Sequence, residues 1–293
     1  MAKNLRLMKY EWMVEPTPQT EWIEGGGKLI WLALFFVELG AGLFFFSIFF
    51  SSLWGMLLGW FIVLALGGGS FLVHMGRPLR AYRALMRPQT SWISRGVIFI
   101  GLFGVIGAIL MALSYVAPNL NLFALQIIAA ISCFLVALYG GLLLNYIRAI
   151  PLWNSGMLPL TLIVAGFWGG AEILLGINLV TGASIERVEP WIRVLLPFFA
   201  LLIPLYLATI HYSSVTGSGS VRRILAGDLA LYFYWGVVVI GLVLPLIVLG
   251  FSISGGPATI SPSLVLGAII CGLIGDLTMR YCIMKGALYS PLI

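Results

Sequence analysis

Charged residues are scarce in this chain. Asp, Glu, Lys and Arg make up 9% of the 293 residues, hydrophobic residues make up 61%, and the mean hydropathy is +1.08. A soluble domain has roughly 25% charged and 45–50% apolar residues. The composition therefore excludes an ordinary soluble protein and predicts an integral membrane protein.

Cysteine and histidine are also rare. The three cysteines, Cys133, Cys271 and Cys282, lie inside apolar runs and show no Cys-x-x-Cys spacing, which argues against a disulfide framework, an iron–sulfur cluster or a zinc site. The only histidines are His74 and His211, and a haem between helices normally needs two facing ligands at matching depth. We expect no haem, no iron–sulfur cluster and no metal in this chain, so any metal cluster belongs to a partner.

Long apolar runs dominate what is present. About 20 apolar residues are needed to cross the hydrocarbon core as a helix, and eight such runs occur, separated by turn-forming residues. They cover residues 29–50, 54–73, 96–117, 122–147, 158–180, 194–211, 229–251 and 264–283. Five tryptophans near the predicted ends are expected to anchor the spans at the membrane interface: Trp22, Trp54, Trp92, Trp153 and Trp191.

The basic residues are distributed unevenly. With eight spans, one face carries both termini and 14 of the 16 Lys and Arg residues, whereas the opposite face carries only Arg187 and Arg193. The positive-inside rule then predicts a multi-pass protein of the inner (plasma) membrane with cytoplasmic termini. The net charge of +6 comes from these loops, whose basic residues would lie near membrane lipids. We expect no nucleic-acid partner. Alternatively, some of the bases dock an acidic partner and say less about sidedness.

Four ionisable residues fall inside the predicted spans, where each one indicates a functional site by default. Glu38 and Glu172 lie in the first and fifth spans, and a neutral carboxyl group can both donate and accept a hydrogen bond, as a proton relay requires. We expect both to face the protein interior without an ionic partner, and structural hydrogen bonding remains the alternative role. Asp276 and Arg280 are four residues apart on one helix, so they can form a pair or take part in proton transfer.

Five segments together resemble the NrfD family of quinone-reactive membrane subunits, which includes that of polysulfide reductase. They are residues 38–42 (ELGAG), 74–78 (HMGRP), 91–96 (SWISRG), 139–145 (YGGLLLN) and 150–154 (IPLWN). The resemblance implies an all-α integral membrane protein with eight transmembrane helices in two four-helix bundles. Residues 1–28 would then form an N-terminal extramembrane segment, residues 29–150 the first bundle with the quinone site, and residues 151–293 the second bundle.

The resemblance also implies a pocket for menaquinone or a related exchangeable quinone in the first bundle. Tyr139 matches the quinone-pocket tyrosine of the family, and His74 ends the second helix beside that pocket. Polysulfide reductase has polar Asn and His where this chain has Ile30 and Ala33, so quinone contacts on the first helix are expected to be apolar. Trp31, Glu38 or His74 would then supply the polarity, with His74 and Glu38 taking part in the proton chemistry.

The family resemblance further implies partners. A ferredoxin-like subunit with [4Fe–4S] clusters would dock near the quinone pocket and connect to a molybdopterin catalytic subunit that holds molybdenum or tungsten. We expect the arginines of the loop between the second and third spans to face this iron–sulfur subunit, near phospholipid headgroups: Arg77, Arg80, Arg83, Arg87 and Arg95. The alternative is that these arginines only enforce the membrane topology.

The sequence thus favours a membrane subunit that exchanges electrons between a quinone and an iron–sulfur partner. This subunit would supply the pocket and the proton access, and it would not be catalytic alone. Two alternatives remain. One is a secondary transporter with Glu38 and Glu172 as coupling sites, although no inverted repeat is evident. The other is a passive membrane anchor for an enzyme.

Overall fold

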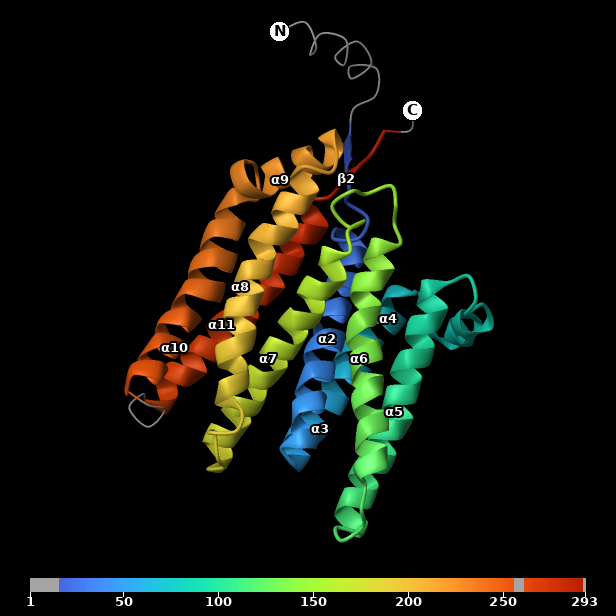
Figure 1. Ribbon diagram of the computed structural model, residues 1–293. Helices are drawn as coiled ribbons and strands as arrows, with labels where there is room; N and C mark the ends of the chain where they lie inside the picture. The colour runs from blue at the N-terminus through green and yellow to red at the C-terminus, as the bar shows by residue number, and fades with distance from the viewer. Residues whose placement is uncertain (1–15, 256–260, 292–293) are drawn as a thin grey trace, which may run out of the picture.

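The computed structural model describes residues 16–255 and 261–291 as long helices that lie side by side (Figure 1). Within these residues, eight helices are long and apolar enough to cross a membrane, which confirms the predicted number. The spans are Gly25–Phe49, Leu53–His74, Trp92–Val116, Phe123–Asn145, Met157–Thr181, Glu189–His211, Tyr232–Ile253 and Pro262–Lys285. The protein is therefore an all-α integral membrane protein.

Most spans are single α-helices. These are α5 (Trp92–Val116), α6 (Phe123–Asn145), α7 (Met157–Thr181), α8 (Glu189–His211) and α11 (Pro262–Lys285). The first span joins the 3-10 turn η1 (Gly25–Gly27) to α2 (Lys28–Phe49). The second and seventh spans contain π-helical stretches: α3 (Leu53–Phe61), η2 (Ile62–Gly68) and α4 (Gly69–His74), and η4 (Tyr232–Val243) followed by α10 (Leu244–Gly255).

The third and sixth spans begin about one helical turn earlier than hydropathy predicts. The third span begins at Trp92 because the Ser91 side chain accepts a hydrogen bond from the Ser94 backbone N–H and caps the helix. The sixth span begins at Glu189, with Pro190 in its first turn, where a missing backbone N–H costs nothing. The first turn of each helix contains charged or polar residues, so a search for long apolar runs places the start of the span after it.

In the described ranges, four elements lie outside the spans: η3 (Pro78–Met86), α9 (Val215–Ala226) and the strands β1 (Thr17–Pro18) and β2 (Leu288–Tyr289). Helix α9 corrects the sequence interpretation, in which turn-forming residues alone separate the apolar runs 194–211 and 229–251. Ser214 accepts a hydrogen bond from the backbone N–H of Gly217 and starts the helix. Its buried residues, including Val221 and Ile224, recur at helical spacing and hold α9 against the bundle.

The central contact of the molecule is between α2 and α7, which lie in the middle of the bundle, whereas α5 and α10 lie near opposite edges (Figure 1). Helix α2 also packs against α3, η2 and α6, and α11 packs against η4, α7 and α2. Glycines allow the α2–α7 approach. A Cβ atom on Gly170 would collide with the backbone of Gly42 and Leu43, and one on Gly42 would collide with the backbone of Gly166.

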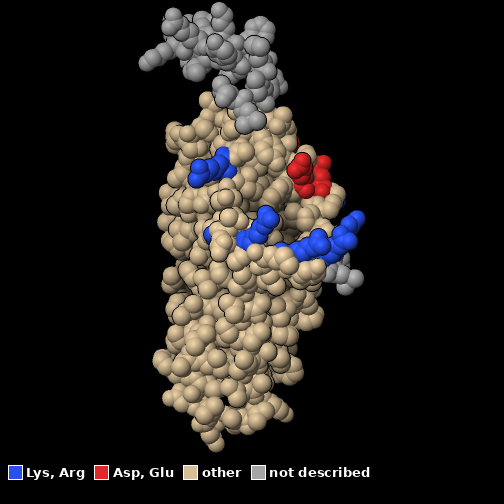
Figure 2. Space-filling view, turned by 90° about the vertical axis from the view of Figure 1, so that its right-hand side faces the viewer, with Lys and Arg blue, Asp and Glu red and all other residues tan. Residues whose placement is uncertain are grey.

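The two ends of the bundle differ in charge. We name the end that carries the loops 75–91, 146–156 and 212–231 the basic face, and the opposite end, with residues 182–188, the far face. In the view of Figure 2, Lys and Arg side chains gather in the upper part of the surface, and no charged side chain appears on the lower half. On the far face, Arg193 pairs with Glu189 at 2.8 Å.

Segments far apart in sequence close the basic face. Strand β1 pairs with β2 in antiparallel register, with Thr17 opposite Tyr289, and the Gln19 backbone N–H donates to the Ala287 carbonyl at 2.9 Å. Trp153, expected at the membrane interface, is instead fully buried and donates from Nε1 to the Ile283 carbonyl at 3.0 Å. The indole can be buried because this bond gives its N–H a partner in place of water.

Candidate functional site

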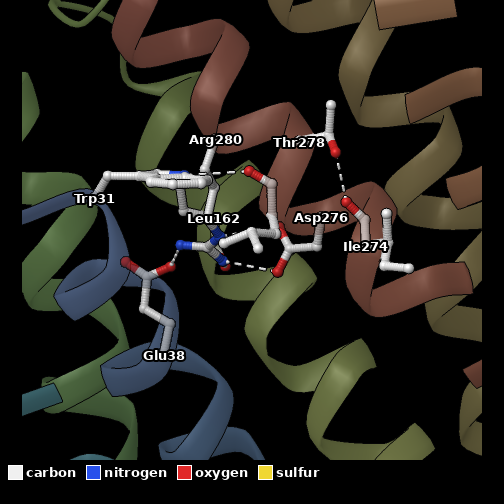
Figure 3. Close-up of polar contacts among 8 residues, drawn as sticks. Trp31, Glu38, Leu162, Ile274, Asp276, Thr278 and Arg280 are labelled. Atoms are coloured by element: carbon white, nitrogen blue, oxygen red, sulfur yellow. Dashed lines mark hydrogen bonds and ion pairs between the residues drawn. The ribbon is translucent and has the colours of Figure 1, made fainter. Parts of the chain in front are cut away.

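A buried ion cluster links α2 to α11 (Figure 3). Arg280 Nη1 donates to Glu38 Oε2, while Nε donates to Asp276 Oδ1 at 2.9 Å and Nη2 to Asp276 Oδ2 at 3.2 Å. All three side chains are at most 4% exposed. The guanidinium thus shares its planar fork between two carboxylates, an arrangement that only arginine can provide.

The cluster confirms one sequence prediction and corrects another. Asp276 and Arg280 pair one helical turn apart, as their spacing predicts. Glu38, however, is not without an ionic partner, because Arg280 reaches it from a helix that lies 242 positions away in sequence. Glu38 and Glu172 both face the protein interior as predicted, with exposures of 0% and 3%.

One oxygen of Glu38 points away from the cluster. Glu38 Oε1 is buried and has no hydrogen-bond partner among the described residues. It lies beside Gly140 of α6, since a Cβ atom placed on that glycine would collide with it. Glu38 therefore connects the ion cluster to the α6 segment that carries Tyr139, which precedes Gly140 in the sequence.

Tyr139 is buried where α6 meets the beginning of α5 and the end of the second span. Its ring lies directly on Gly96, where any Cβ atom would collide with it, and its centroid is 6.3 Å from that of Phe71 in α4. Within the described part of the protein, its hydroxyl has no hydrogen-bond partner. A phenol in apolar surroundings without a partner is a polar group available to a ligand.

His74 lies three residues after Phe71, at the basic face. Its Nδ1 donates to the Gly26 carbonyl of η1 at 3.0 Å, and its side chain is exposed. This bond assigns the proton to Nδ1, so Nε2 is the nitrogen that can accept a proton from outside. His74 and Tyr139 therefore lie near the same end of the bundle.

The other predicted quinone contacts on α2 are Ile30, Trp31 and Ala33. Trp31 Nε1 donates to the Leu277 carbonyl of α11 at 3.2 Å, and the indole meets the Tyr281 ring edge-on. In the view of Figure 3 the indole lies above the guanidinium group of Arg280. Ile30 and Ala33 are buried apolar core residues. Trp31 and Arg280 line the same small cavity, and the indole N–H is already satisfied by the protein.

The arginine-rich loop contains the 3-10 helix η3. Arg77, Arg80, Arg83 and Arg87 are exposed around it. Arg95 differs, because its Nε donates to the Pro88 carbonyl and its Nη2 to the Gln89 carbonyl, both at 2.8 Å, and it stacks over Trp92. Arg95 therefore shapes the loop. The four exposed arginines, of which Arg83 lies over the Tyr82 ring, can meet another molecule.

On α9, Arg223 donates two hydrogen bonds to Asp228, at 3.2 and 2.8 Å. These bonds hold the pKa of Asp228 below its ordinary value, because they favour the charged carboxylate. The pair is partly exposed at the basic face and provides a surface counterpart to the buried cluster.

Comparison with known proteins bears directly on this arrangement. The family model for polysulphide reductase, NrfD, matches residues 26–290. The protein belongs to this family. It is also 28% identical over 150 residues to the C subunit of the anaerobic dimethyl sulfoxide reductase of Escherichia coli (strain K12). That match covers 50% of this sequence and 50% of the relative, so the protein spans about half the length of the curated relative that it matches.

Sequence reasoning on this NrfD-family protein missed two residues near the far face. Glu189 and Ser252, from α8 and α10, share a hydrogen bond donated by the serine hydroxyl. The spacing of Glu189 and Arg193, with Pro190 between them, is a helix-start pattern that could have revealed the first residue. Ser252 has no comparable signal, because only the fold brings it to Glu189.

The ion cluster generates a stability prediction. Replacing Arg280 with Met leaves two buried carboxylates without their cation, so the free energy of unfolding should fall by about 3–5 kcal/mol. The surface variant Asp228→Asn should cost at most about 1 kcal/mol. Thermal unfolding of the purified protein in detergent measures both. The triple variant Glu38→Gln, Asp276→Asn, Arg280→Met should recover most of the loss, and a single variant as stable as the surface control would contradict the cluster's role.

Proposed function

We propose that this protein is the membrane subunit of a respiratory oxidoreductase complex and exchanges electrons between menaquinone, or a related quinone, and an iron–sulfur partner. Membership of the NrfD family supports the role in a membrane oxidoreductase. The similarity to one subunit of an anaerobic dimethyl sulfoxide reductase supports a place beside other subunits. In this proposal the first four spans form the quinone bundle and the last four form the second bundle.

The observation that carries the proposal is the unpartnered hydroxyl of Tyr139. A buried phenol that rests on Gly96 and has no partner among the described residues fits a carbonyl acceptor such as that of a quinone. When bound, the quinone supplies the two-electron chemistry that the protein side chains lack. Tyr139 would orient it by donating a hydrogen bond, and Phe71 and Gly96 would form the adjoining wall.

Proton access in this proposal uses two groups. His74 holds its Nδ1 proton on the Gly26 carbonyl, so Nε2 can take up or release a proton at the basic face. Glu38 places one oxygen on Arg280 and the other beside Gly140, next in sequence to Tyr139. It is thus the interior carboxylate that we assign to proton transfer with the pocket.

The partner in this proposal is a ferredoxin-like [4Fe–4S] subunit, connected to a molybdopterin subunit. Its docking surface is the loop around η3, where four arginines are exposed at the basic face. Arginine recognises carboxylates through two parallel hydrogen bonds, which suits an acidic partner surface. Co-purification with stoichiometric iron and with molybdenum or tungsten would support this assembly, and a protein that purifies alone with transport activity would overturn it.

Loss of the Tyr139 hydroxyl should weaken quinol binding. In Tyr139→Phe, one hydrogen bond worth about 0.5–1.5 kcal/mol disappears with little change of volume. The KM for quinol should rise roughly two- to thirteenfold, measured as quinol-linked turnover of the purified complex. Tyr206→Phe is the matched control, because that buried hydroxyl donates to the Leu152 carbonyl at 2.5 Å instead. Equal kinetics in the two variants would reject Tyr139 as the ligand.

Glu38→Gln tests the proton role. Glutamine keeps the shape of the side chain but cannot ionise, so turnover should fall at least tenfold and lose its dependence on pH, because a positioned proton-transfer group contributes roughly 10²–10⁴-fold. The complex should still assemble. Glu24→Gln, which removes only the surface pair with Lys285, serves as the control. A wild-type pH profile in Glu38→Gln would leave Glu38 a purely structural group.

Partner docking can be tested at the η3 loop. Replacing Arg77, Arg80 and Arg83 with Gln removes three of the charges that would hold the partner. Because salt screens the exposed charge pairs that remain, the extrinsic subunits should be released at moderate salt. Size-exclusion chromatography at increasing salt concentration measures this release. Arg187→Gln together with Arg193→Gln changes only the far face and should leave the complex intact. If the η3 variant also stays intact, these arginines serve membrane topology alone.

A further inference from the structure

A cavity of about 70 Å³ lies among the last four spans, between α7, α8, α10 and α11. Most of its lining is apolar, with residues such as Leu175, Leu196 and Leu249. Three polar side chains interrupt this lining: Glu172 of α7, Glu189 of α8 and Ser252 of α10. Of the described residues around the cavity, Glu172 and Glu189 are the only titratable ones.

The two carboxylates lie at different depths. Glu189 begins α8 near the far face, where it accepts hydrogen bonds from Arg193 and Ser252. Glu172 lies nine residues before the end of α7 at Thr181, which is roughly 13 Å into the span at 1.5 Å per residue. Its Oε2 is buried and has no hydrogen-bond partner among the described residues. The cavity therefore extends from the far face toward an unsatisfied carboxylate inside the membrane.

The size and lining of the cavity select its occupant. A benzene ring occupies an apolar cavity of about 150 Å³, so a quinone ring is too large. A water molecule needs roughly 10–15 Å³ of such volume and two to four polar partners, so about five waters would fit. Glu189 and Ser252 supply such partners at the far-face end of the cavity, and Glu172 supplies them at the inner end.

The inner end of the cavity, at Glu172, adjoins α11, the helix that carries two residues of the ion cluster. Gly272 of α11 packs against both oxygens of Glu172, and Asp276 follows one turn later on the same helix. Residues four positions apart share one face of a helix, so Asp276 lies on the face of α11 that Gly272 turns toward Glu172. Asp276 in turn binds Arg280, which binds Glu38. Ionisable groups thus continue from the cavity across α11 to α2.

We infer that this cavity is a hydrated path that gives protons access from the far face to Glu172 and, through Asp276, to the ion cluster. The hydration of the path is independent of the proposed quinone chemistry, whereas its use during turnover rests on that proposed function. Protons would enter at Glu189 and Ser252, pass along water to Glu172, and exchange with the cluster beside Asp276. The basic face and the far face would then both communicate with the protein interior.

Cysteine accessibility tests the hydration directly. Ala268 lines the cavity, whereas the neighbouring Gly267 is exposed on the outside of α11 and would bear a side chain without any contact. Ala268→Cys and Gly267→Cys, each in a Cys271→Ser background, form a matched pair in the full-length protein reconstituted into liposomes. Aminoethyl methanethiosulfonate, a small water-soluble reagent, is added at the far face, and intact mass spectrometry follows the reaction.

A thiol in a hydrated cavity should react at least tenfold faster than one facing lipid. Equal, slow reaction at both positions would overturn the hydrated path, even if quinol turnover is normal. Size-exclusion profiles matching the wild type establish that both variants are folded. A misfolded Ala268→Cys protein is replaced by Val265→Cys, which lines the same cavity.

The second measurement follows protons in the reconstituted complex, with a pH-sensitive dye confined to the far-face compartment. Glu172→Gln should abolish the proton exchange at the far face that accompanies turnover, while Glu186→Gln, an exposed far-face carboxylate, should preserve it. Turnover of the wild-type complex without any far-face proton signal would overturn the path and leave the proposed function intact. Absence of quinol turnover in the wild-type complex would reject the proposed function instead.

Discussion

The cost of placing charge inside a hydrocarbon layer governs this structure. A charged side chain at the centre of a spanning helix costs roughly 2.5–3.5 kcal/mol on insertion scales, and Glu38, Asp276 and Arg280 bring three ionisable groups into that region. Arg280 offsets the cost by binding both carboxylates at once. The arrangement works only if α2 and α11 keep one relative position, so the cluster fixes the first span against the last.

Close helix packing makes that position reachable. The Arg280 guanidinium lies 3.5 Å from the Leu162 carbonyl of α7, the helix that contacts both α2 and α11. Helix α7 can lie this close to α2 because Gly42, Gly166 and Gly170 present backbone to backbone. The glycines set the distance between the helices, and at this distance the charged side chains can reach one another.

The sequence allowed the prediction of features that depend on local pattern. Eight apolar runs predicted eight spans, and the i, i+4 spacing of Asp276 and Arg280 predicted their pair. The bond between Glu38 and Arg280 could not be predicted, because hydropathy does not say which helices become neighbours. Helix α9 was not predicted because the serines and glycines at its start are also turn formers. The burial of Trp153 was not predicted because it depends on a carbonyl that is distant in the sequence.

The strand pair at the basic face has a consequence for biosynthesis. Thr17 pairs with Tyr289, so β1 lacks this partner strand until the final span and the segment after it have left the ribosome. At roughly 5–20 residues per second, a ribosome needs about 15–55 s to reach β2 after it has made β1. Throughout that time the Gln19 backbone N–H lacks the Ala287 carbonyl that it binds in the finished protein. Closure of the basic face is therefore a late event, and it marks a protein whose eight helices have all been synthesised.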